Sequence, residues 1–485
     1  MPELDKFKMD MYDLVKNVKM KQNVTNNLQN TLKRDMRNIR QSNEVYVPAD
    51  KTSNYYRMPK NDYENLVLKC ITNEYKKSSE FIVNKVNIDD KKLAEKLDID
   101  DRVYKLNDSQ AFVTIKDHKP NFRNNTKCRL INSAKPELGK VSKSILSKVV
   151  TSLRSKTQLN QWKNTYSVIE WFKNLNEKNT LSFIQFDIVD FYSSISEKLL
   201  KNALNYAKSI VDLSTDEIQI ILQTKQSILF NKEQAWVKKG SNQFNVTMGS
   251  YDGAEAADLI GIYMLSQLTK LNLNIGLYRD DGLAVCNLRP RQAELTRKKL
   301  CAIFKENGLS ITSTANVKNV NFLDVNFDLE ENIYRPYMKP NDKPVYVHHE
   351  SNHPKSILDN IPYSVNKRLS LISSNRDVFE QAAPPYQEAL KDSGYSHKLE
   401  FDPNVAPPKK SRNRKRRITY FNPPFSLNVK TNIGKEFFKL LKANFPKEHP
   451  LSKIINKNTV KLGYSCMPNL KHKINCHNQK ICRGK

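Results

Sequence analysis

Paired cysteines, long apolar runs and internal repeats are all missing from this sequence. The cysteines are odd in number and show no paired spacing, which argues against a disulfide framework and favours a reducing compartment: Cys70, Cys128, Cys286, Cys301, Cys466, Cys476 and Cys482. The N-terminal residues contain no apolar core of signal-peptide length, and the best apolar run, residues 259–265, is too short to cross a bilayer. No period indicates a solenoid. We therefore expect a soluble, intracellular protein without a membrane partner.

Acidic residues are also in short supply. The chain has 80 Lys and Arg against 51 Asp and Glu, a net charge of +29 that is spread along most of the sequence. Such a surplus is typical of proteins that bind a polyanion, because each phosphate that they neutralise releases counterions. A generic basic surface, such as a ribosome-associated protein carries, would give the same excess. Charge therefore predicts the class of partner and leaves the chemistry open.

The 485 residues, 39% of them hydrophobic, are enough for two to four domains with buried cores. Residues 1–95 have helical spacing and predict a charged, helical N-terminal extension. In residues 96–338, short β-rich runs at 112–115, 181–188 and 282–286 alternate with amphipathic stretches, which predicts a core of mixed helices and strands. We expect residues 339–402 to be helical with breaks at His353-Pro354 and Pro384-Pro385. Residues 403–417 should be a basic linker, and residues 418–485 a basic C-terminal segment that binds nucleic acid.

Three aspartates in this core point to chemistry. Asp187 ends an apolar run that reads as a strand, where an ionised carboxylate is costly unless a cation or hydrogen bonds compensate it. Asp280 and Asp281 lie between the apolar runs 275–277 and 283–286, which predicts a β-hairpin with the acids at its turn. Adjacent carboxylates repel each other, and a divalent ion is the usual remedy.

Taken alone, two aspartates in a turn are usually solvated turn residues. Together with Asp187 they supply three carboxylates, which can hold two Mg²⁺ ions about 3.5–4 Å apart for in-line phosphoryl transfer. Mg²⁺ prefers a few carboxylates with waters and phosphates, so cysteine or histidine ligands are not required, and Mn²⁺ is a possible substitute. One ion would lower the pKa of a primer 3′-hydroxyl, and the other would stabilise the leaving pyrophosphate.

These residues resemble reverse transcriptases, most closely those of the Penelope-like retroelements, whose polymerase is similar to telomerase. The resemblance runs in order through about residues 110–330: 115–119 and 129–133 resemble the fingers, 186–192 the first palm motif, 248–250 the template-positioning motif, 278–281 the second palm motif, 307–309 the next motif and 321–325 the start of the primer grip. Pro48-Ala49-Asp50-Lys51 resembles a signature upstream of the fingers.

The resemblance implies an α+β, right-hand polymerase with fingers, palm and a thumb in residues 339–402. Its palm sheet would be antiparallel and flanked by helices, with the helical N-terminal and basic C-terminal extensions added. The resemblance also implies an RNA template, a DNA primer or duplex and deoxynucleoside triphosphates (dNTPs) as partners, and no small-molecule cofactor.

The resemblance assigns roles residue by residue. The metal-binding, catalytic acids would be Asp187, Asp280 and Asp281, and dNTP binding would involve Lys116, Arg129, Tyr192 and Gly249. A guanidinium fork suits phosphate oxygens, although Lys116 and Arg129 could instead contact the nucleic-acid backbone. Tyr192 would be the steric gate against a ribose 2′-hydroxyl, with ordinary packing as the alternative and the neighbouring Phe191 leaving the register open. Gly249 would allow close approach of the template or base pair.

Two further roles follow from the same resemblance. Lys318 is a candidate general acid for pyrophosphate, and the primer grip would include Phe322, Leu323 and Asp324. Departures from the family pattern occur at Arg279, at Ser193-Ser194 and at Tyr251-Asp252-Gly253, and none of them replaces a predicted metal ligand.

The C-terminal part carries weaker signals. Residues 409–417 are rich in Lys and Arg and predict either a nuclear-import signal or a nucleic-acid clamp, so we expect localisation to the nucleus after synthesis in the cytoplasm. The cysteines and histidines after residue 465 fit no standard zinc spacing. Gly261-Ile262-Tyr263 lies in an apolar, helix-like stretch without a following Tyr-Ile-Gly, so a GIY-YIG endonuclease is not predicted.

The sequence thus predicts an RNA-directed DNA polymerase that extends a primer 3′-hydroxyl. Two alternatives stay open: a catalytically decayed retroelement protein that only binds RNA or DNA, and an RNA-copying RNA polymerase with the same palm.

Overall fold

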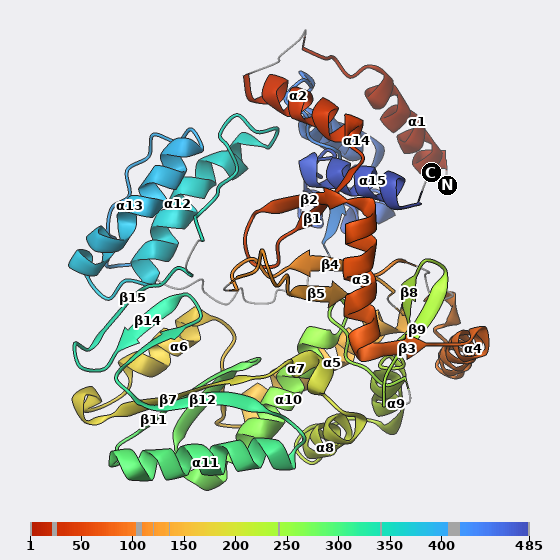
Figure 1. The fold of residues 1–485 in the computed structure, drawn as a ribbon. Helices are drawn as coiled ribbons and strands as arrows, with labels where there is room; N and C mark the ends of the chain where they lie inside the picture. Colours follow the sequence, from red (N-terminus) through yellow and green to blue (C-terminus); the bar gives the residue numbers. More distant parts are fainter. Residues whose placement is uncertain are drawn as a thin grey trace. The chain divides into compact units, whose positions relative to one another are not determined.

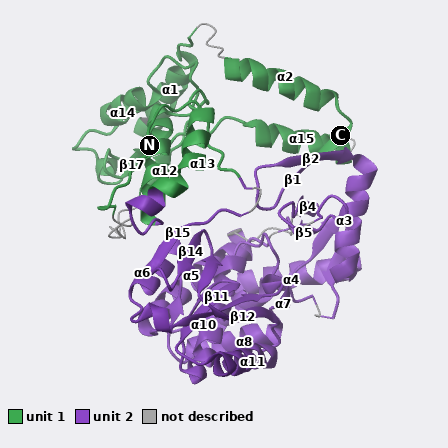
Figure 2. Ribbon diagram, turned by 60° about the vertical axis from the view of Figure 1, so that its left-hand side comes forward, with its two compact units in different colours: residues 1–46, 343–371, 380–485 green, residues 47–342, 372–379 purple. Residues whose placement is uncertain are grey.

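The computed structural model describes residues 2–21, 27–102, 109–119, 121–134, 136–240, 243–339, 342–405 and 418–483. The chain divides into two compact units (Figure 2). The first unit comprises residues 1–46, 343–371 and 380–485, and the second comprises residues 47–342 and 372–379. None of the described helices is long and apolar enough to span a membrane.

A five-stranded sheet forms the centre of the second unit (Figure 1). Its order is β12 (Ile311–Val317), β7 (Ser182–Ile188), β11 (Asp281–Cys286), β10 (Asn274–Tyr278) and β6 (Asn160–Gln161). Neighbouring strands are antiparallel except β6, which runs parallel to β10. The predicted strands at 181–188 and 282–286 are confirmed as β7 and β11, and the predicted hairpin is confirmed as β10–β11.

The two faces of this sheet are covered differently because successive side chains of a strand point to opposite sides. Ile184, Phe186 and Ile188 of β7 are buried in a core with helices α5 (Leu138–Lys156), α8 (Glu197–Lys208), α9 (Thr215–Gln223), α10 (Gly253–Leu268) and α11 (Pro290–Glu306). Phe183 points the other way and packs with Trp162, Val285 and helix α6 (Thr165–Lys173). Asp187 lies on the same face as Phe183, at the opposite end of the strand.

A second, three-stranded antiparallel sheet covers part of that face. It consists of β13 (Asn319–Phe322), β14 (Val325–Asp328) and β15 (Ile333–Pro336). Phe322 and Phe327 are buried in the same cluster as Trp162 and Phe172. Gln185, between Phe183 and Asp187 on β7, donates from Nε2 to the Asn321 carbonyl at 2.8 Å, so β13 lies over the middle of β7.

Smaller elements of the second unit surround the sheet. The predicted strand at 112–115 is confirmed as β4 (Phe112–Ile115), which pairs with β5 (Cys128–Ile131). The remaining elements are β2 (Tyr55–Pro59), α3 (Lys60–Glu74), β3 (Tyr75–Lys77), α4 (Glu80–Lys96), η1 (Asp100–Arg102), η2 (Lys178–Thr180), α7 (Phe191–Ser194), β8 (Leu229–Asn231), β9 (Gln234–Lys238) and η3 (Thr269–Leu271). Strand β1 (Glu44–Pro48), which pairs with β2, crosses from the first unit into the second.

The first unit is assembled from segments far apart in the sequence. Helix α1 (Pro2–Lys16) packs against α14 (Ile433–Asn444), where the Phe7 ring lies 6.2 Å from that of Phe437 and 5.4 Å from that of Phe445. Helix α2 (Asn27–Gln41) packs against α15 (Leu470–Arg483). Strands β16 (Thr419–Phe421) and β17 (Val460–Leu462) pair in parallel, and η4 (Pro450–Lys453) lies between α14 and β17 in the chain. Residues 1–46 therefore share a core with the C-terminal segment.

Two helices follow the second sheet, α12 (Lys355–Leu371) and α13 (Arg376–Asp392). The break at His353-Pro354 is confirmed, since α12 begins just after it. The break predicted at Pro384-Pro385 is wrong, because α13 continues through both prolines. Each proline removes one N–H donor from the helix, but Ala389 and Leu390 beyond them are buried, and this packing offsets the lost hydrogen bonds. Of the predicted basic linker, residues 406–417 lie outside the described residues.

A buried ion pair joins three of the helices that carry the second unit's sheet. The Lys225 ammonium lies 2.5 Å from a carboxylate oxygen of Asp252, and both side chains are only 1% exposed. The hydroxyls of Ser142 on α5 and Thr224 just after α9 donate to the same oxygen. Because Asp252 precedes the first residue of α10, this cluster fixes the start of α10 and the loop before it.

We expect Asp252→Asn to lower the free energy of unfolding by about 3–5 kcal/mol, because it leaves the Lys225 charge buried without a partner. Adding Lys225→Met should restore part of this loss, since no charge then remains to be desolvated. Denaturant unfolding of the four proteins of the cycle measures this coupling. The control cycle is the exposed pair of Lys96 and Asp216, 2.9 Å apart, whose coupling should stay below about 1 kcal/mol. Additive losses at residues 225 and 252 would contradict the expectation.

A second expectation concerns pH. Burial raises the pKa of Asp90 on α4 from 3.8 to about 6, although a hydrogen bond from Gln223 opposes this shift. The folded state therefore binds the Asp90 proton more tightly than the unfolded chain does, and its stability falls as pH rises from about 4 to about 6. Asp90→Asn should raise the free energy of unfolding by about 2–3 kcal/mol at pH 7.5 and by about half as much at pH 5. Urea unfolding at both pH values checks this, with the exposed Asp212→Asn as a control.

Candidate active site

The register of the central sheet brings two of the predicted acids together. Asp281, the first residue of β11, lies directly opposite Asp187 of β7. Directly opposed residues of antiparallel strands have their Cα atoms about 4.5–5.5 Å apart and their side chains on the same face. That face carries Gln185 and Phe183 farther along β7, and it is the face not covered by the core helices.

The third acid lies in the adjacent turn. Tyr278 pairs with Asp281, so Arg279 and Asp280 form a two-residue hairpin turn. Arg279 has a φ of 55°, and a positive φ in the first position is a feature of the tight turns that suit a twisted hairpin. The Asp280 carbonyl accepts a hydrogen bond from the Ile188 amide at 2.9 Å, which joins the turn to the end of β7.

The environment of these acids shifts the pKa of two of them, Asp187 and Asp281. Burial, together with the charges of Asp280 and Asp187, raises the pKa of Asp281 to about 6. Burial also raises the pKa of Asp187, with Asp280 as the next cause. The three acids together form a donor set of oxygens only, which is the set that hard divalent cations prefer. As the side chains stand, no group of three or more His, Cys, Asp or Glu in the described ranges is arranged as a metal site.

Three lysines from distant segments surround these acids. Lys51 lies in the loop between β1 and β2, Lys119 follows β4, and Lys339 follows β15. The charges of Lys51 and Lys119 oppose the rise in the pKa of Asp187, and those of Lys339 and Lys51 oppose the rise in the pKa of Asp281. Partial burial of the Lys339 ammonium lowers its own pKa, and the adjacent Lys51 lowers it further. The site therefore combines clustered carboxylates with clustered ammonium groups, as the binding of a metal and a polyphosphate would require.

Among the predicted fingers residues, Arg129 is held by an acid. Its Nη1 lies 2.8 Å from Oδ1 of Asp50, whose side chain is 5% exposed. The loop that carries Asp50 is fixed in turn by Asp117, because Thr52, Asn54 and Tyr56 all donate to Oδ2 of its carboxylate. Lys116 follows β4, and its amide donates to the Lys127 carbonyl at 2.8 Å.

The two aromatic residues after Asp187 have different environments. Phe191 is 2% exposed and belongs to the main core, whereas Tyr192 is only partly buried at its edge. Burial raises the pKa of the Tyr192 hydroxyl, and the charges of Arg279 and Asp280 nearby act on it as well. Of the two rings, Tyr192 is thus the one that could contact a ligand beside the acids.

Gly249 makes its close contact with the protein itself. Its φ is 107°, and a Cβ at this position would lie 2.8 Å from the Asn132 carbonyl oxygen. The Asn132 amide also donates to the Met248 carbonyl at 3.3 Å. The loop of residues 248–250 therefore lies directly against residues 129–133 of the predicted fingers.

Two backbone carbonyls bind the side chain of Lys318. Its ammonium donates to the carbonyls of Asn179 and Leu181 at 2.6 and 2.7 Å, just before β7 begins. Of the predicted primer-grip residues, Phe322 is buried, while Leu323 and Asp324 form the turn between β13 and β14. The Thr165 hydroxyl donates to the Asp324 carboxylate, and the Asp324 carbonyl accepts from the Tyr337 amide.

Sequence reasoning assigned no role to four residues of this site. Lys119 ends the 115–119 stretch, but no pattern there shows that its charge acts on Asp187. Lys339 lies outside every motif, and no local pattern marks it. Lys51 and Asp50 belong to the Pro48-Ala49-Asp50-Lys51 signature, but nothing in that signature shows that Asp50 pairs with Arg129 or that Lys51 approaches the acids.

Two comparisons concern the sequence. Residues 345–402 match the family model of the animal helix-turn-helix domain, and these residues contain α12, α13 and the turn between them. A search of curated proteins finds no match to this sequence.

Comparison with solved structures identifies the fold. Telomerase from Candida albicans, solved with a TWJ fragment of telomeric RNA, superposes with a TM-score of 0.50 at 11% identity, over 72% of this chain and 63% of that one. Apo telomerase from Candida tropicalis also matches, with a TM-score of 0.47 at 10% identity, over 74% of this chain and 67% of that one. The RNA-dependent RNA polymerase of a human picorbirnavirus matches with a TM-score of 0.43 at 8% identity, over 81% of this chain and 88% of that one. The chain has the mixed α+β fold of a right-hand polymerase, as predicted. It spans 63% of the length of the Candida albicans telomerase chain.

We expect Gly249→Ala to destabilise the protein more than a matched change elsewhere. Gly240 also has a positive φ, 70°, but a Cβ there would meet nothing within 4 Å. Gly240→Ala should therefore cost only about 1 kcal/mol of backbone strain, whereas Gly249→Ala should cost at least about 2 kcal/mol because its methyl group also displaces residue 132. Denaturant unfolding measures both, and equal losses would show that the close contact has no energetic consequence.

Proposed function

We propose that this protein is an RNA-directed DNA polymerase, a reverse transcriptase of the Penelope-like kind, which extends a primer 3′-hydroxyl with dNTPs. The observation that carries the proposal is the register of β7 and β11, which sets Asp187 opposite Asp281 with Asp280 in the adjoining turn. The polymerase fold supports it, and so does the bound RNA fragment of one structural neighbour.

In this proposal Asp187, Asp280 and Asp281 hold two Mg²⁺ ions, or Mn²⁺ in their place. When bound, such a pair of ions activates the attacking hydroxyl and stabilises the charge on the leaving group. The donor set fits, because the charge of Asp280 raises the pKa of both Asp187 and Asp281, and a cation would relieve that repulsion.

The remaining residues bind and orient the substrates. Lys51, Lys119 and Lys339 supply positive charge for the triphosphate, and Arg129, oriented by Asp50, supplies a planar fork for its oxygens. Lys116 stays a proposed phosphate contact of the fingers.

Tyr192 selects dNTPs by colliding with a ribose 2′-hydroxyl, and the turn formed by Leu323 and Asp324 holds the primer end. Lys318, whose ammonium donates to the carbonyls of Asn179 and Leu181, stays a candidate general acid for pyrophosphate.

The partners in this proposal are an RNA template, a DNA primer or duplex and dNTPs, and the site of action is the nucleus. The net charge of +29 supports a polyanionic partner. The basic residues 409–417, on which the nuclear proposal rests, lie outside the described part of the chain.

Primer extension tests the proposal. With Mg²⁺, a DNA primer and an RNA template, the protein should incorporate dNTPs, and Asp187→Asn or Asp281→Asn should lower the rate by at least about a thousandfold because each removes a metal ligand. The exposed Asp212→Asn, which changes the charge equally, should retain the rate of the unmodified protein. Equal incorporation by Asp281→Asn would reject the assignment of the acids.

The same assay separates the alternatives. Salt-sensitive RNA binding without extension under either metal would identify a decayed, binding-only protein. Free incorporation of ribonucleotides by the unmodified protein would identify an RNA polymerase. Tyr192→Ala should admit ribonucleotides while it leaves dNTP incorporation within about tenfold, and Phe191→Leu, in the core, should not change this selectivity.

A further inference from the structure

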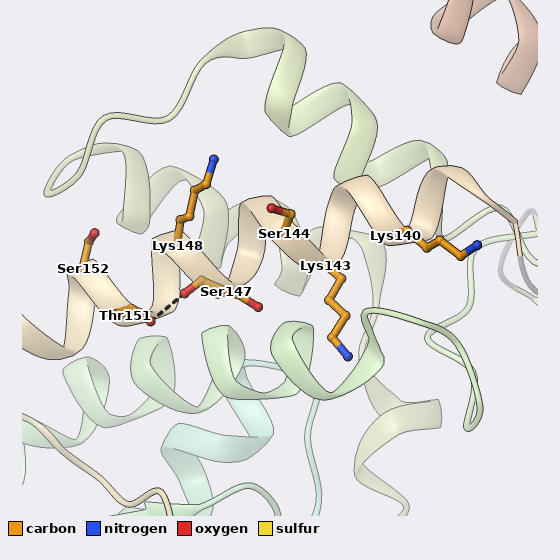
Figure 3. A pocket seen from close by; sticks show the side chains of 7 residues that line it. All are labelled: Lys140, Lys143, Ser144, Ser147, Lys148, Thr151 and Ser152. Carbon is orange, nitrogen blue, oxygen red and sulfur yellow. Dashed lines mark hydrogen bonds between the residues drawn. The ribbon is translucent and has the colours of Figure 1, made fainter. Parts of the chain in front are cut away.

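Helix α5 exposes a face that the proposed active site does not use. The helix contains no acidic residue over its 19 positions. Seven of its side chains line a groove of about 660 Å³ (Figure 3): Lys140, Lys143, Ser144, Ser147, Lys148, Thr151 and Ser152. Their spacing of three and four residues places them on one half of the helix, over a length of about 18 Å.

The opposite half of α5 is buried in the core of the second unit. Leu138, Leu146, Val150 and Leu153 are at most 2% exposed, and α5 packs against α10. The polar half is therefore held rigidly, because rotation of the helix would expose these apolar side chains to water.

The groove carries positive charge and unused hydrogen-bonding groups. Lys140 and Lys143 are 58% and 53% exposed. Lys140 forms a close ion pair with Glu137, whereas Glu255 lies 3.7 Å from the Lys143 ammonium and neutralises its charge only in part. Lys148 makes no ion pair within the described residues, and the hydroxyls of Ser144 and Ser147 make no hydrogen bond there. Ammonium groups interleaved with hydroxyls are the side chains that contact nucleic-acid phosphates.

One end of the groove adjoins the loop that precedes α10. The Lys140 ammonium lies 5.3 Å from the centre of the Tyr251 ring, and a Cβ on Gly139 would lie 3.4 Å from the same side chain. Tyr251 directly follows residues 248–250, the predicted template-positioning loop. A strand that leaves this loop would therefore enter the groove at Lys140.

We propose that the polar face of α5 binds the backbone of the single-stranded template RNA on its way to or from the residue 248–250 loop. This inference rests on the proposed polymerase function and extends it to a path for the template. The phosphates contact Lys143 and Lys148, while the hydroxyls of Ser144 and Ser147 bond to ribose 2′-hydroxyls, which both donate and accept.

The test measures binding to primer–template duplexes that differ only in their single-stranded template overhang. Fluorescence anisotropy compares an overhang of about 2 nucleotides with one of about 12, a length within the range that single-strand-binding surfaces cover. Lys143→Gln/Lys148→Gln should weaken binding to the long overhang about fivefold or more and leave the short one unchanged. For this variant, the slope of log affinity against log salt should become about 1.4 smaller in magnitude, since each of the two lost phosphate contacts on a single strand contributes about 0.7.

The matched control is Lys298→Gln/Lys299→Gln on α11, which packs against β12 and loses the same charge from exposed positions. It should keep the affinity of the unmodified protein for both overhangs. Equal losses on short and long overhangs, or an unchanged salt slope in the α5 variant, would overturn the proposal.

A second variant tests the preference for RNA. Ser144→Ala/Ser147→Ala should lower the affinity for a long RNA overhang and not for a DNA overhang of the same sequence. Equal effects on both would overturn the assignment of the hydroxyls. Because binding needs no catalysis, the two proposals can fail separately. A protein that binds the long overhang through α5 but does not extend the primer would contradict the polymerase proposal. A protein that extends the primer, and whose α5 variants bind the long overhang as tightly as the unmodified protein, would contradict the proposed template path.

Discussion

The pairing of β7 with β11 is the constraint on which the rest of the site depends. Gly282 lies opposite Phe186, and a Cβ on Gly282 would come within 2.1 Å of that ring. The glycine that follows the two acids therefore makes room for an aromatic ring of the core. A slip of one residue would place another residue under the Phe186 ring and turn Asp187 toward the apolar helices, where its charge would be costly to bury. The same packing that stabilises the sheet thus sets the carboxylates face to face.

The second condition is a balance of charge between segments that are remote in the sequence. The carboxylates of Asp187 and Asp281 come from the sheet, and the ammonium groups of Lys51, Lys119 and Lys339 come from three separate loops. In the absence of ligand the ammonium groups stabilise the ionised carboxylates. A metal and a polyphosphate would satisfy both sets at once, so the substrate and the metal are expected to bind more tightly together than apart.

What the sequence could predict was local. The apolar runs predicted β4, β7 and β11, and the two acids between two apolar runs predicted the β10–β11 hairpin. Both patterns depend only on residues that are neighbours in the sequence. Gly249 was predicted to allow close approach of the template or base pair, and the close contact that the structure shows there is with Asn132. The wrong break at Pro384-Pro385 has the same origin, since local propensity does not include the burial of Leu390.

What could not be predicted depends on contacts between distant segments. No pattern around Lys339 shows that it reaches Asp281, and no pattern around Lys318 shows that its ammonium binds the carbonyls of Asn179 and Leu181. The pairing of Asp50 with Arg129 likewise joins two motifs that the sequence presents separately. Such partners become visible only when the register and packing of the whole unit are known.

The first unit has a consequence for how the chain matures on the ribosome. The Lys19 amide donates to the Thr431 hydroxyl, 412 residues later, and the Phe7 ring packs on Phe437. At about 5–20 residues per second, α1 emerges on the order of half a minute before its partner helix exists. Met9, Tyr12 and Val15, which stay exposed even in the finished fold, add to an apolar surface that a chaperone would have to shield meanwhile. Slowing translation of the second unit should therefore lower the yield of correctly folded protein.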